Sequence, residues 1–424
     1  MVFSKNFKNL NMKYCSIKTF ALVAILLINA CTSSDVSNNK YPTINIADNI
    51  GRGYLLNISE IAESVEYIPL ETTDSSLVGD LSQVYYTNGF FVLNTFKNSK
   101  GILKVFDRKG QFHNTLSRLG RGPEEYTSIN SIDTYKNNIV ILTIHNIIEY
   151  SLDGKFIKSV PVKKEEFCNG YGNIKKIDDN HYLLITMPDS KIQNKYSAII
   201  VDSSAKTMLS FNYPKSAIEI AKNRKGRVKG LDNPVIFSNR SQGKVVTGND
   251  EFILSHSKDY ESIDTIYRIN YGKYKITADN IKRISKRSSH INLYGQILES
   301  VDHMFFNLSL RTLAHKPMKM IRRGGKDTVM LFPFSCALYD KRDGSFRLID
   351  QPEDYQKGFI EDFEGGPAFW PSYISDDEYM ISYIEAIDFI QHAQTHKVSD
   401  KFKKIADGLT EDDNPVVVLV KLKN

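Results

Sequence analysis

The segment from residue 101 to residue 142 contains a regular succession of apolar runs and turn signals. An apolar run at residues 102–106 leads into a charged turn that closes at Gly110, and a second run follows at residues 112–116. A corner rich in glycine, arginine and proline spans residues 118–126, and two more apolar runs complete the segment. Short apolar runs bounded by glycine and proline are typical of β-strands. The pattern therefore predicts consecutive strands joined by tight turns.

The same succession recurs along the chain. Turns similar to that at Gly110 occur near Gly154, Lys206, Gly272 and Gly344, and the intervals between them grow from 44 to 72 residues. The first interval matches the roughly 40–50 residues of a four-stranded propeller blade, and the later ones fit the same unit with insertions. About 380 residues in such units predict one closed ring of blades.

Six third strands can be placed when the strands of each blade are labelled a to d from the axis outwards. They are expected at residues 102–107, 147–152, 198–202, 265–269, 337–340 and 416–422. The last of them runs into the C-terminus, whereas residues 65–70 (VEYIPL) precede the first blade. We expect residues 65–70 to supply strand d of the last blade, which covers an open sheet edge. The predicted fold is an all-β, six-bladed β-propeller that an N-terminal strand closes.

The N-terminus carries an export signal. The apolar run at residues 19–30 follows four lysines without any acid, and it is shorter than the about 20 residues that cross a bilayer. Its ending, LINAC at residues 27–31, resembles a bacterial lipoprotein box in which Cys31 is lipidated. We therefore predict a signal peptide at 1–30, a polar tether at 31–45 and the propeller at 46–424. Translation starts at Met1 or Met12, because Met12 also opens a leader of conventional length.

Charge and cysteine usage agree with export. The chain has a net charge of +6, but four lysines and no acids precede Cys31, which leaves +2 on the remainder. We therefore expect no nucleic-acid partner. Cys168 and Cys336 remain for the folded part, where they form either one disulfide or, the alternative we favour, two buried free thiols.

Four long insertions are predicted on one face of the propeller, because d-to-a and b-to-c connections emerge together. They span residues 214–240, 309–327, 351–371 and 386–414. Loops longer than about 12 residues inside a compact domain are usually functional or disordered, so this face is the expected binding surface. Apolar residues at helical spacing within 384–408 predict one or two helices packed on the propeller face.

The candidate ligand contacts on this face are basic and aromatic. The arginines and lysines of the insertions could form a rim at the channel mouth that attracts carboxylated, sulfated or phosphorylated ligands, or they are solvated loop charges. Trp370, the sole tryptophan, either stacks on a ligand or fills the core between blades, which is the favoured alternative. Arg121 and Glu124 either contact the ligand or brace the glycine–proline corner, which is the favoured alternative. The predicted ligand-binding residues are Arg118, Arg121, Arg240, Arg322, Arg323 and Trp370.

Enzyme motifs give little support to catalysis. The chain has no G-x-S-x-G, Walker or H-E-x-x-H motif, and His392 and His396 lack the glutamate of the last. No catalytic residue and no cofactor is predicted. A site for Ca²⁺ or another divalent metal in the channel remains an alternative, because propellers can hold metals with residues from separate blades. Candidate histidines for such a site are His145, His181, His256 and His303.

Several local phrases carry a resemblance to known proteins. They are VEYIPLE at 65–71, LGRGPEEY at 119–126, DTIYRI at 264–269, GGPAFWP at 365–371 and EDDNP at 411–415. The repeat is similar to an NHL-type propeller repeat. From residue 46 onwards the chain resembles the six-bladed β-propeller lipoproteins of Bacteroidetes, an NHL-like or TolB-like class.

Two functions of different class are consistent with this resemblance. The favoured one is a monomeric, non-enzymatic binding or scaffold lipoprotein in the cell envelope. It would be anchored at the outer membrane through Cys31, on the periplasmic or external side, and would hold a glycan, peptide or protein partner on its insertion-rich face. The alternative is a propeller hydrolase or lyase with a metal in the central channel.

Overall fold

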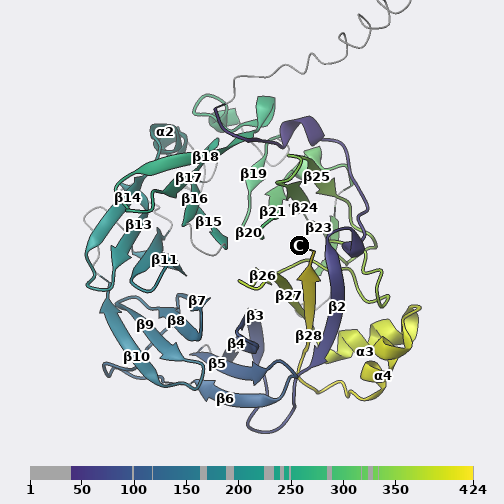
Figure 1. Ribbon diagram of the computed structural model, residues 1–424. Coiled ribbons are helices and arrows are strands. Elements are labelled where there is room, and N and C mark those ends of the chain that lie inside the picture. The colour runs from purple at the N-terminus through teal and green to yellow at the C-terminus, as the bar shows by residue number, and fades with distance from the viewer. Residues whose placement is uncertain are drawn as a thin grey trace, which may run out of the picture. The chain divides into compact units, whose positions relative to one another are not determined.

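Strands in the computed structural model form six four-stranded antiparallel blades around a central axis (Figure 1). The blades belong to the compact unit formed by residues 42–424. No helix among the described residues is long and apolar enough to cross a membrane. The structure describes residues 40–97, 100–116, 118–162, 170–187, 195–223, 234–238, 243–247, 250–283, 289–316, 318–322, 328–332 and 334–423.

Blades 1 to 3 follow one another along the chain, each with its four strands in sequence order. Blade 1 consists of β3 (Asp80–Thr87), β4 (Phe90–Lys97), β5 (Lys100–Asp107) and β6 (Phe112–Leu116). Blade 2 consists of β7 (Ser131–Tyr135), β8 (Asn138–Leu142), β9 (Asn146–Ser151) and β10 (Phe156–Pro161). Blade 3 consists of β11 (Tyr171–Lys176), β12 (His181–Thr186), β13 (Tyr196–Asp202) and β14 (Thr207–Asn212).

Tight c–d turns of similar geometry end the third strands of these blades. In blade 1, the Asp107 carboxylate accepts the backbone N–H groups of Lys109 and Gln111, and Gly110 has a φ of 82°. Such a positive φ favours glycine because it has no Cβ. In blade 3 the equivalent residue is Ala205, with a φ of 65°. The recurrent turn signal therefore marks the ends of these third strands correctly.

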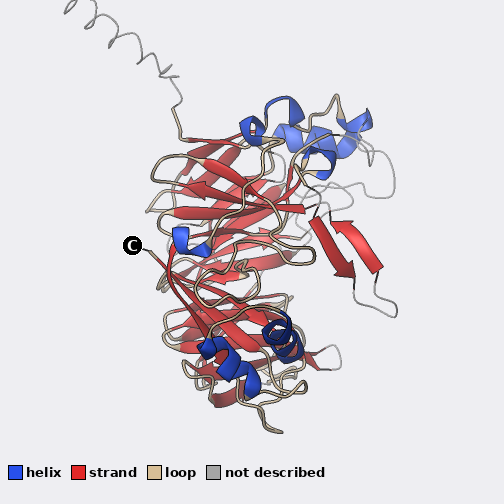
Figure 2. Ribbon diagram, turned by 90° about the vertical axis from the view of Figure 1, so that its right-hand side faces the viewer, coloured by secondary structure: helices blue, strands red, loops and turns tan. Residues whose placement is uncertain are grey.

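Blades 4 and 5 depart from this regularity. Blade 4 consists of β15 (Pro234–Ser238), β16 (Lys244–Thr247), β17 (Phe252–His256) and β18 (Ile263–Asn270). Blade 5 consists of β20 (Ile297–Glu299), β21 (His303–Ser309), β24 (Phe334–Asp340) and β25 (Phe346–Ile349), with β19 (Asn292–Leu293) beside β21. A hairpin of β22 (Met318–Arg322) and β23 (Thr328–Phe332) is inserted between β21 and β24. This two-stranded hairpin stands clear of the blade sheets in the side view (Figure 2).

The predicted third strand of blade 4 is wrong. Residues 265–269 lie in β18, which is strand d, and strand c is β17. The true c–d turn joins Ser257 to Ser262. It contains no glycine, and Tyr260 takes the left-handed conformation there, with a φ of 61°. Gly272, which suggested the turn, lies in a short helix after strand d.

Blade 6 closes the ring with strands from both ends of the chain. It consists of β26 (Tyr373–Ile374), β27 (Tyr379–Ile384), β28 (Val416–Leu422) and the N-terminal β2 (Ala62–Pro69). Val65 pairs with Val420 and Pro69 with Val416, so the predicted clasp is confirmed. Successive residues of β28 point into different hydrophobic clusters, because a blade is covered by neighbours on both faces.

The segment that precedes the clasp follows the outer edge of the ring. β1 (Thr43–Asn45) pairs in parallel with β18, as a fifth strand of blade 4. Single bridges then join Tyr54 to Ile349 and Asn57 to Ile360 before β2 reaches blade 6. The last residues of the stretch assigned to the tether thus lie in a blade.

Two helices near the C-terminus pack on the clasp. The predicted insertion forms α3 (Ala386–Thr395) and α4 (Asp400–Asp407). The ring of Tyr67 in β2 lies edge-on to Phe389 and Phe402, at centroid distances of 5.4 and 4.8 Å. Both helices therefore cover the outermost strand of blade 6, at the periphery of the ring (Figure 1), and α3 also lines a cavity on the insertion-rich face.

The remaining helices are short. α2 (Lys215–Asn223) lies in the connection between blades 3 and 4. The 3-10 helices are η1 (Ala47–Asn49), η2 (Ile58–Glu60), η3 (Gly272–Tyr274), η4 (Ile281–Arg283) and η5 (Arg311–Leu313).

Candidate functional site

A groove of about 980 Å³ opens on the insertion-rich face, over blades 5, 6 and 1. One wall is the insertion at residues 351–371, and the other is α3. Its floor is formed where strands of the three blades begin or end, at Ser82, Gln296 and Ser382. Two of the four predicted long insertions therefore enclose a cavity of the size that ligand pockets have, about 300–1,000 Å³.

A buried carboxylate fixes the insertion that forms this wall. Glu361 is 4% exposed and accepts hydrogen bonds from the Tyr67 hydroxyl at 3.0 Å and from the backbone N–H groups of Phe363 and Glu364. Burial and this carboxylate raise the pKa of Tyr67. A Cβ at Gly366 would lie 1.9 Å from the Tyr67 hydroxyl oxygen, so this approach requires glycine.

The groove is acidic. Its lining includes one lysine, Lys357, and four carboxylates, Glu353, Asp354, Glu385 and Asp388. Lys319 pairs with Asp354 at 2.6 Å, and His396 lies 3.3 Å from Glu353. The charge of the groove is thus opposite to that of the predicted basic rim, so the groove itself favours neutral or cationic ligands over anions.

Two aromatic residues on the groove have different roles. Trp370 is 6% exposed, donates its indole N–H to Asn307 at 3.1 Å and stacks on Phe359 with centroids 5.8 Å apart. It therefore fills the core between blades 5 and 6, and a ligand contact by Trp370 stays a prediction. Tyr355, which the sequence did not single out, is 42% exposed and has a φ of 75°.

The predicted arginines are dispersed. Arg118 pairs with Glu124 at 3.3 Å and donates to the Gly154 carbonyl of the next blade, so it lies at the seam between blades 1 and 2. Arg121 is exposed on the same corner, which the bonds of Arg118 and Glu125 brace. Arg322 lies in β22. Arg240 and Arg323 fall outside the described residues, and a ligand role for these arginines stays a prediction.

A second, smaller cavity of about 170 Å³ lies at the channel mouth next to the groove. First strands of several blades line it, through Tyr85, Asp133, Lys175 and Tyr373 among others, and Gln296 borders both cavities. The Lys175 ammonium lies 3.1 Å from the Asp133 carboxylate, and both side chains are buried. Burial alone would lower the pKa of Lys175, but the Asp133 carboxylate together with Tyr373 and Asp376 outweighs burial, and the pKa is raised.

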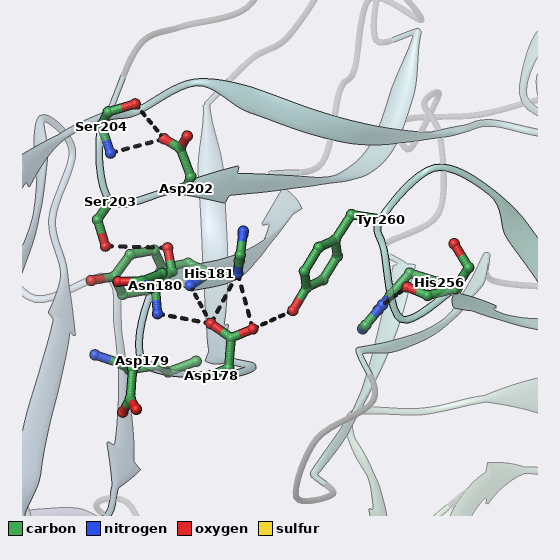
Figure 3. Close-up of polar contacts among 12 residues, drawn as sticks. Asp178, Asp179, Asn180, His181, Asp202, Ser203, Ser204, His256 and Tyr260 are labelled. Atoms are coloured by element: carbon green, nitrogen blue, oxygen red, sulfur yellow. Dashed lines mark hydrogen bonds and ion pairs between the residues drawn. The ribbon is translucent and has the colours of Figure 1, made fainter.

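The four candidate histidines of a channel metal site do not converge. His181 and His256 flank the ring of Tyr260 at 4.1 and 4.8 Å, at the seam of blades 3 and 4 (Figure 3). His303 lies 3.6 Å from Asp340 in blade 5, and His145 precedes β9. No group of three or more His, Cys, Asp or Glu side chains that could hold a metal is found in the described part of the chain.

The His392 and His396 pair and the two cysteines were the other candidates. The rings of His392 and His396 stack at 4.1 Å, and His392 Nε2 lies 2.9 Å from the Gly365 carbonyl oxygen. Burial lowers the pKa of His392. Cys336 is a buried free thiol, and burial raises its pKa to about 12. Cys168 lies outside the described residues.

Sequence reasoning missed the residues of the channel mouth. One signal was available: three first strands carry polar residues two positions apart, as Gln83 and Tyr85, Ser131 and Asp133, and Asn173 and Lys175. In a strand, residues at this spacing share one face. The same pattern in three blades indicates a polar channel wall.

Comparisons with known proteins identify a family and a fold. A family model described as a domain of unknown function (DUF4934) matches residues 41–421. No curated protein matches the chain. A crystal structure from Bacteroides fragilis, of a protein named as a candidate exported protein, is similar with a TM-score of 0.61 and 17% identity. The similarity covers 91% of this chain and 100% of that one.

Other solved structures are more distant. The WD40 domain of Neurospora crassa Pan2 has a TM-score of 0.37 and 9% identity over 82% of this chain and 90% of that one. A Bacteroides caccae protein of unknown function has a TM-score of 0.35 and 10% identity over 63% of this chain and 81% of that one. The relation to NHL-type repeats stays a prediction.

Proposed function

The chain belongs to the DUF4934 family, and we propose that within it this protein is an exported lipoprotein that binds a glycan, peptide or protein partner in the groove. It is a binding or scaffold protein rather than an enzyme. The observation that carries the proposal is the groove itself, a cavity of about 980 Å³ that two insertions form on one face of an otherwise regular propeller.

Export and anchoring are supported by the N-terminal sequence. The lysine-rich leader, the apolar run and Cys31 have the order of a lipoprotein signal. The similar Bacteroides fragilis protein is itself named as a candidate exported protein. Lipid on Cys31 would hold the protein at the outer membrane, with the polar residues after it as a tether.

The residues that line the groove limit the classes of partner that fit it. Four carboxylates face one lysine among its charged lining residues, so a strongly anionic partner would be repelled. Gln296, Asn307 and Gln356 add amide groups that can donate and accept hydrogen bonds. The exposed ring of Tyr355 offers an apolar face beside them. Neutral glycans and cationic peptide segments are therefore the favoured partners.

Anchoring and binding are tested separately. In cells given a clickable fatty acid, wild-type protein should carry the label and sediment with membranes, whereas Cys31→Ser should be unlabelled and released from them. Label on the variant would contradict anchoring through Cys31.

Binding is tested on glycan and cationic-peptide arrays with purified protein. Tyr355→Ala and Asp388→Asn should each weaken capture of a wild-type ligand about tenfold or more, the effect of a central contact residue. Asp153→Asn, on the opposite face, is the matched control and should leave capture unchanged. Equal capture by all variants would refute the groove as the binding site.

A further inference from the structure

We propose that the channel mouth is a separate binding site for one neutral, hydroxyl-rich ring of monosaccharide size. The inference rests on the proposed function, since Gln296 borders both the groove and this cavity. The groove would then receive a partner, and the channel mouth would hold one polyhydroxylated unit of it.

The size of the cavity limits what it can hold. Its volume is about 170 Å³, below the about 300–1,000 Å³ of pockets for drug-sized ligands. Most of its lining residues lie in strands of the blades rather than in loops, and the rings of Tyr85 and Tyr373 contact each other edge-on at 5.1 Å. A single ring fits this space, whereas an oligosaccharide would extend into the groove.

Two polar groups in the wall lack partners. Tyr85 is 7% exposed and lines the cavity, and no hydrogen bond of its hydroxyl is found among the described residues. The side-chain oxygen of Asn94 is buried and also unpaired. Neighbouring groups are satisfied: the hydroxyls of Tyr373 and Thr134 lie 3.0 Å apart, and Gln83 donates to the Ser372 carbonyl. Since buried polar groups in proteins are nearly always paired, the Asn94 oxygen calls for a partner, and Tyr85 lines the cavity beside it.

Strand geometry directs these groups to one place. Asn94 in β4 pairs with Gln83 in β3, and Tyr85 lies two residues further along β3. Paired residues and residues two apart share a face of the sheet. Gln83 and Tyr85 both contact blade 6, so Asn94 and Tyr85 present an acceptor and a hydroxyl to the same side.

The charges in the wall favour a neutral ligand. Lys175 and Asp133 pair with each other, so the cavity has no excess charge. A ligand carboxylate would approach Asp133, and a ligand amine would approach Lys175. Burial raises the pKa of Tyr85, so its hydroxyl stays protonated and can donate. Hydroxyl groups, which both donate and accept, complement Tyr85, Asn94 and the remaining N–H donors of Lys175.

The test measures sugar binding by saturation-transfer NMR and titration calorimetry on the purified full chain. The probes are neutral hexoses and pentoses, the charged counterparts glucuronate and glucosamine, and the open-chain polyol sorbitol. We expect at least one neutral pyranose to bind at millimolar concentration, about tenfold or more tightly than its charged counterparts. Failure of every neutral sugar to bind, as expected if water alone fills the cavity, or preference for a charged probe or sorbitol, would overturn the inference.

Variants that remove the Tyr85 hydroxyl or the Asn94 amide locate the site. Tyr85→Phe and Asn94→Ala should each weaken sugar binding about three- to tenfold, the effect of one hydrogen bond. Tyr150→Phe is the matched control, because its hydroxyl donates to the Glu124 carbonyl at the seam of blades 1 and 2. Sugar binding that is lost in Tyr355→Ala but retained in Tyr85→Phe would place the sugar in the groove. That result would refute the channel-mouth site and leave the proposed function standing.

Discussion

Two tyrosines with left-handed backbone lie on opposite faces of the propeller. Tyr260 has a φ of 61° in a c–d turn of the short-turn face, and Tyr355 has a φ of 75° beside the groove. This conformation is unfavourable for a residue with a Cβ and persists where other interactions impose it. The two residues differ in the contacts that their side chains make.

Side-chain contacts stabilise the conformation of Tyr260. Its hydroxyl donates to Asp178, which also lies 2.9 Å from His181 Nδ1, and its ring is flanked by His181 and His256 (Figure 3). His256 in turn accepts the Gly243 N–H at 3.2 Å. Since Asp178 and His181 belong to blade 3 and Tyr260 and His256 to blade 4, this cluster joins two blades.

The side chain of Tyr355 has no comparable contacts. In the described part of the chain, we find no hydrogen bond or ring contact of this side chain. Backbone contacts hold the loop instead: Tyr355 donates its N–H to the Lys319 carbonyl at 3.1 Å, next to the ion pair of Lys319 and Asp354. Strain without a local stabilising role is typical of binding sites. The comparison therefore indicates a stabilising role for the residues around Tyr260, and it agrees with the binding proposed for the face that carries Tyr355.

The variant with the largest expected effect tests whether residues near the short-turn face stabilise the fold. Glu149 is 1% exposed at the seam of blades 2 and 3, and accepts hydrogen bonds from Lys176 and Tyr182. Burial would raise the pKa of Glu149, but these hydrogen bonds lower it. Glu149→Ala leaves the buried Lys176 without its carboxylate and should cost about 3–5 kcal/mol of unfolding free energy, measured with urea.

A double variant provides the control for that measurement. Glu149→Leu combined with Lys176→Met replaces the ion pair by apolar side chains and should recover much of the lost stability. A loss below about 1 kcal/mol in Glu149→Ala would show that the seam does not depend on this carboxylate.

A smaller effect, dependent on pH, is expected at the Tyr260 cluster. Burial opposes ionisation of Asp178, but hydrogen bonds from Tyr260, Asn180 and His181 lower its pKa to about 2. Because this lies below the unfolded value of about 3.9, the carboxylate stabilises the fold above that value and loses its contribution as the pH falls toward 2. Asp178→Asn should cost about 1 kcal/mol at neutral pH, since partial exposure screens the interaction.

Urea unfolding at several pH values measures this difference. The stability gap between wild type and Asp178→Asn should be full at about pH 6 and smaller at about pH 3. A gap that widens on acidification would contradict the assignment.

The smallest expected effect has the opposite sign. Tyr355→Gly removes the strain and should raise the unfolding free energy by about 0.5 kcal/mol, after the entropy cost of glycine, while it reduces partner capture. The same substitution at Tyr260 relieves equal strain but deletes the hydrogen bond and both ring contacts, so it should destabilise. Thermal and urea unfolding of the two variants side by side measure the contrast. If both variants were destabilised by a similar amount, the proposed difference between the roles of Tyr260 and Tyr355 would be wrong.

Much of the fold could be predicted because each blade is a local unit. The runs around Gly110 and Gly154 gave the correct strands, and the clasp followed from the unpaired β28 at the end of the chain. The prediction failed at blade 4 because Tyr260 occupies the turn position where blades 1, 2 and 5 have glycine. The left-handed conformation of Tyr260 is stabilised by Asp178 and His181 of another blade, so the local sequence does not predict it.

The candidate site was predicted only as a face. The insertions at 351–371 and 386–414 do form the groove, but its acidic lining and Tyr355 were not foreseen. Trp370 attracted attention as the sole tryptophan, although packing on Phe359 buries it.

By itself, the sequence determined the six-bladed ring, its N-terminal clasp and the face that carries the insertions, because apolar periodicity and turn residues act over a few neighbouring positions. Only the tertiary structure decided which polar residues meet. Tyr85, Lys175 and Tyr373 come from three blades and become neighbours when β2 pairs with β28 and closes the ring. The groove and the channel mouth exist through that closure, since no single blade contains either of them.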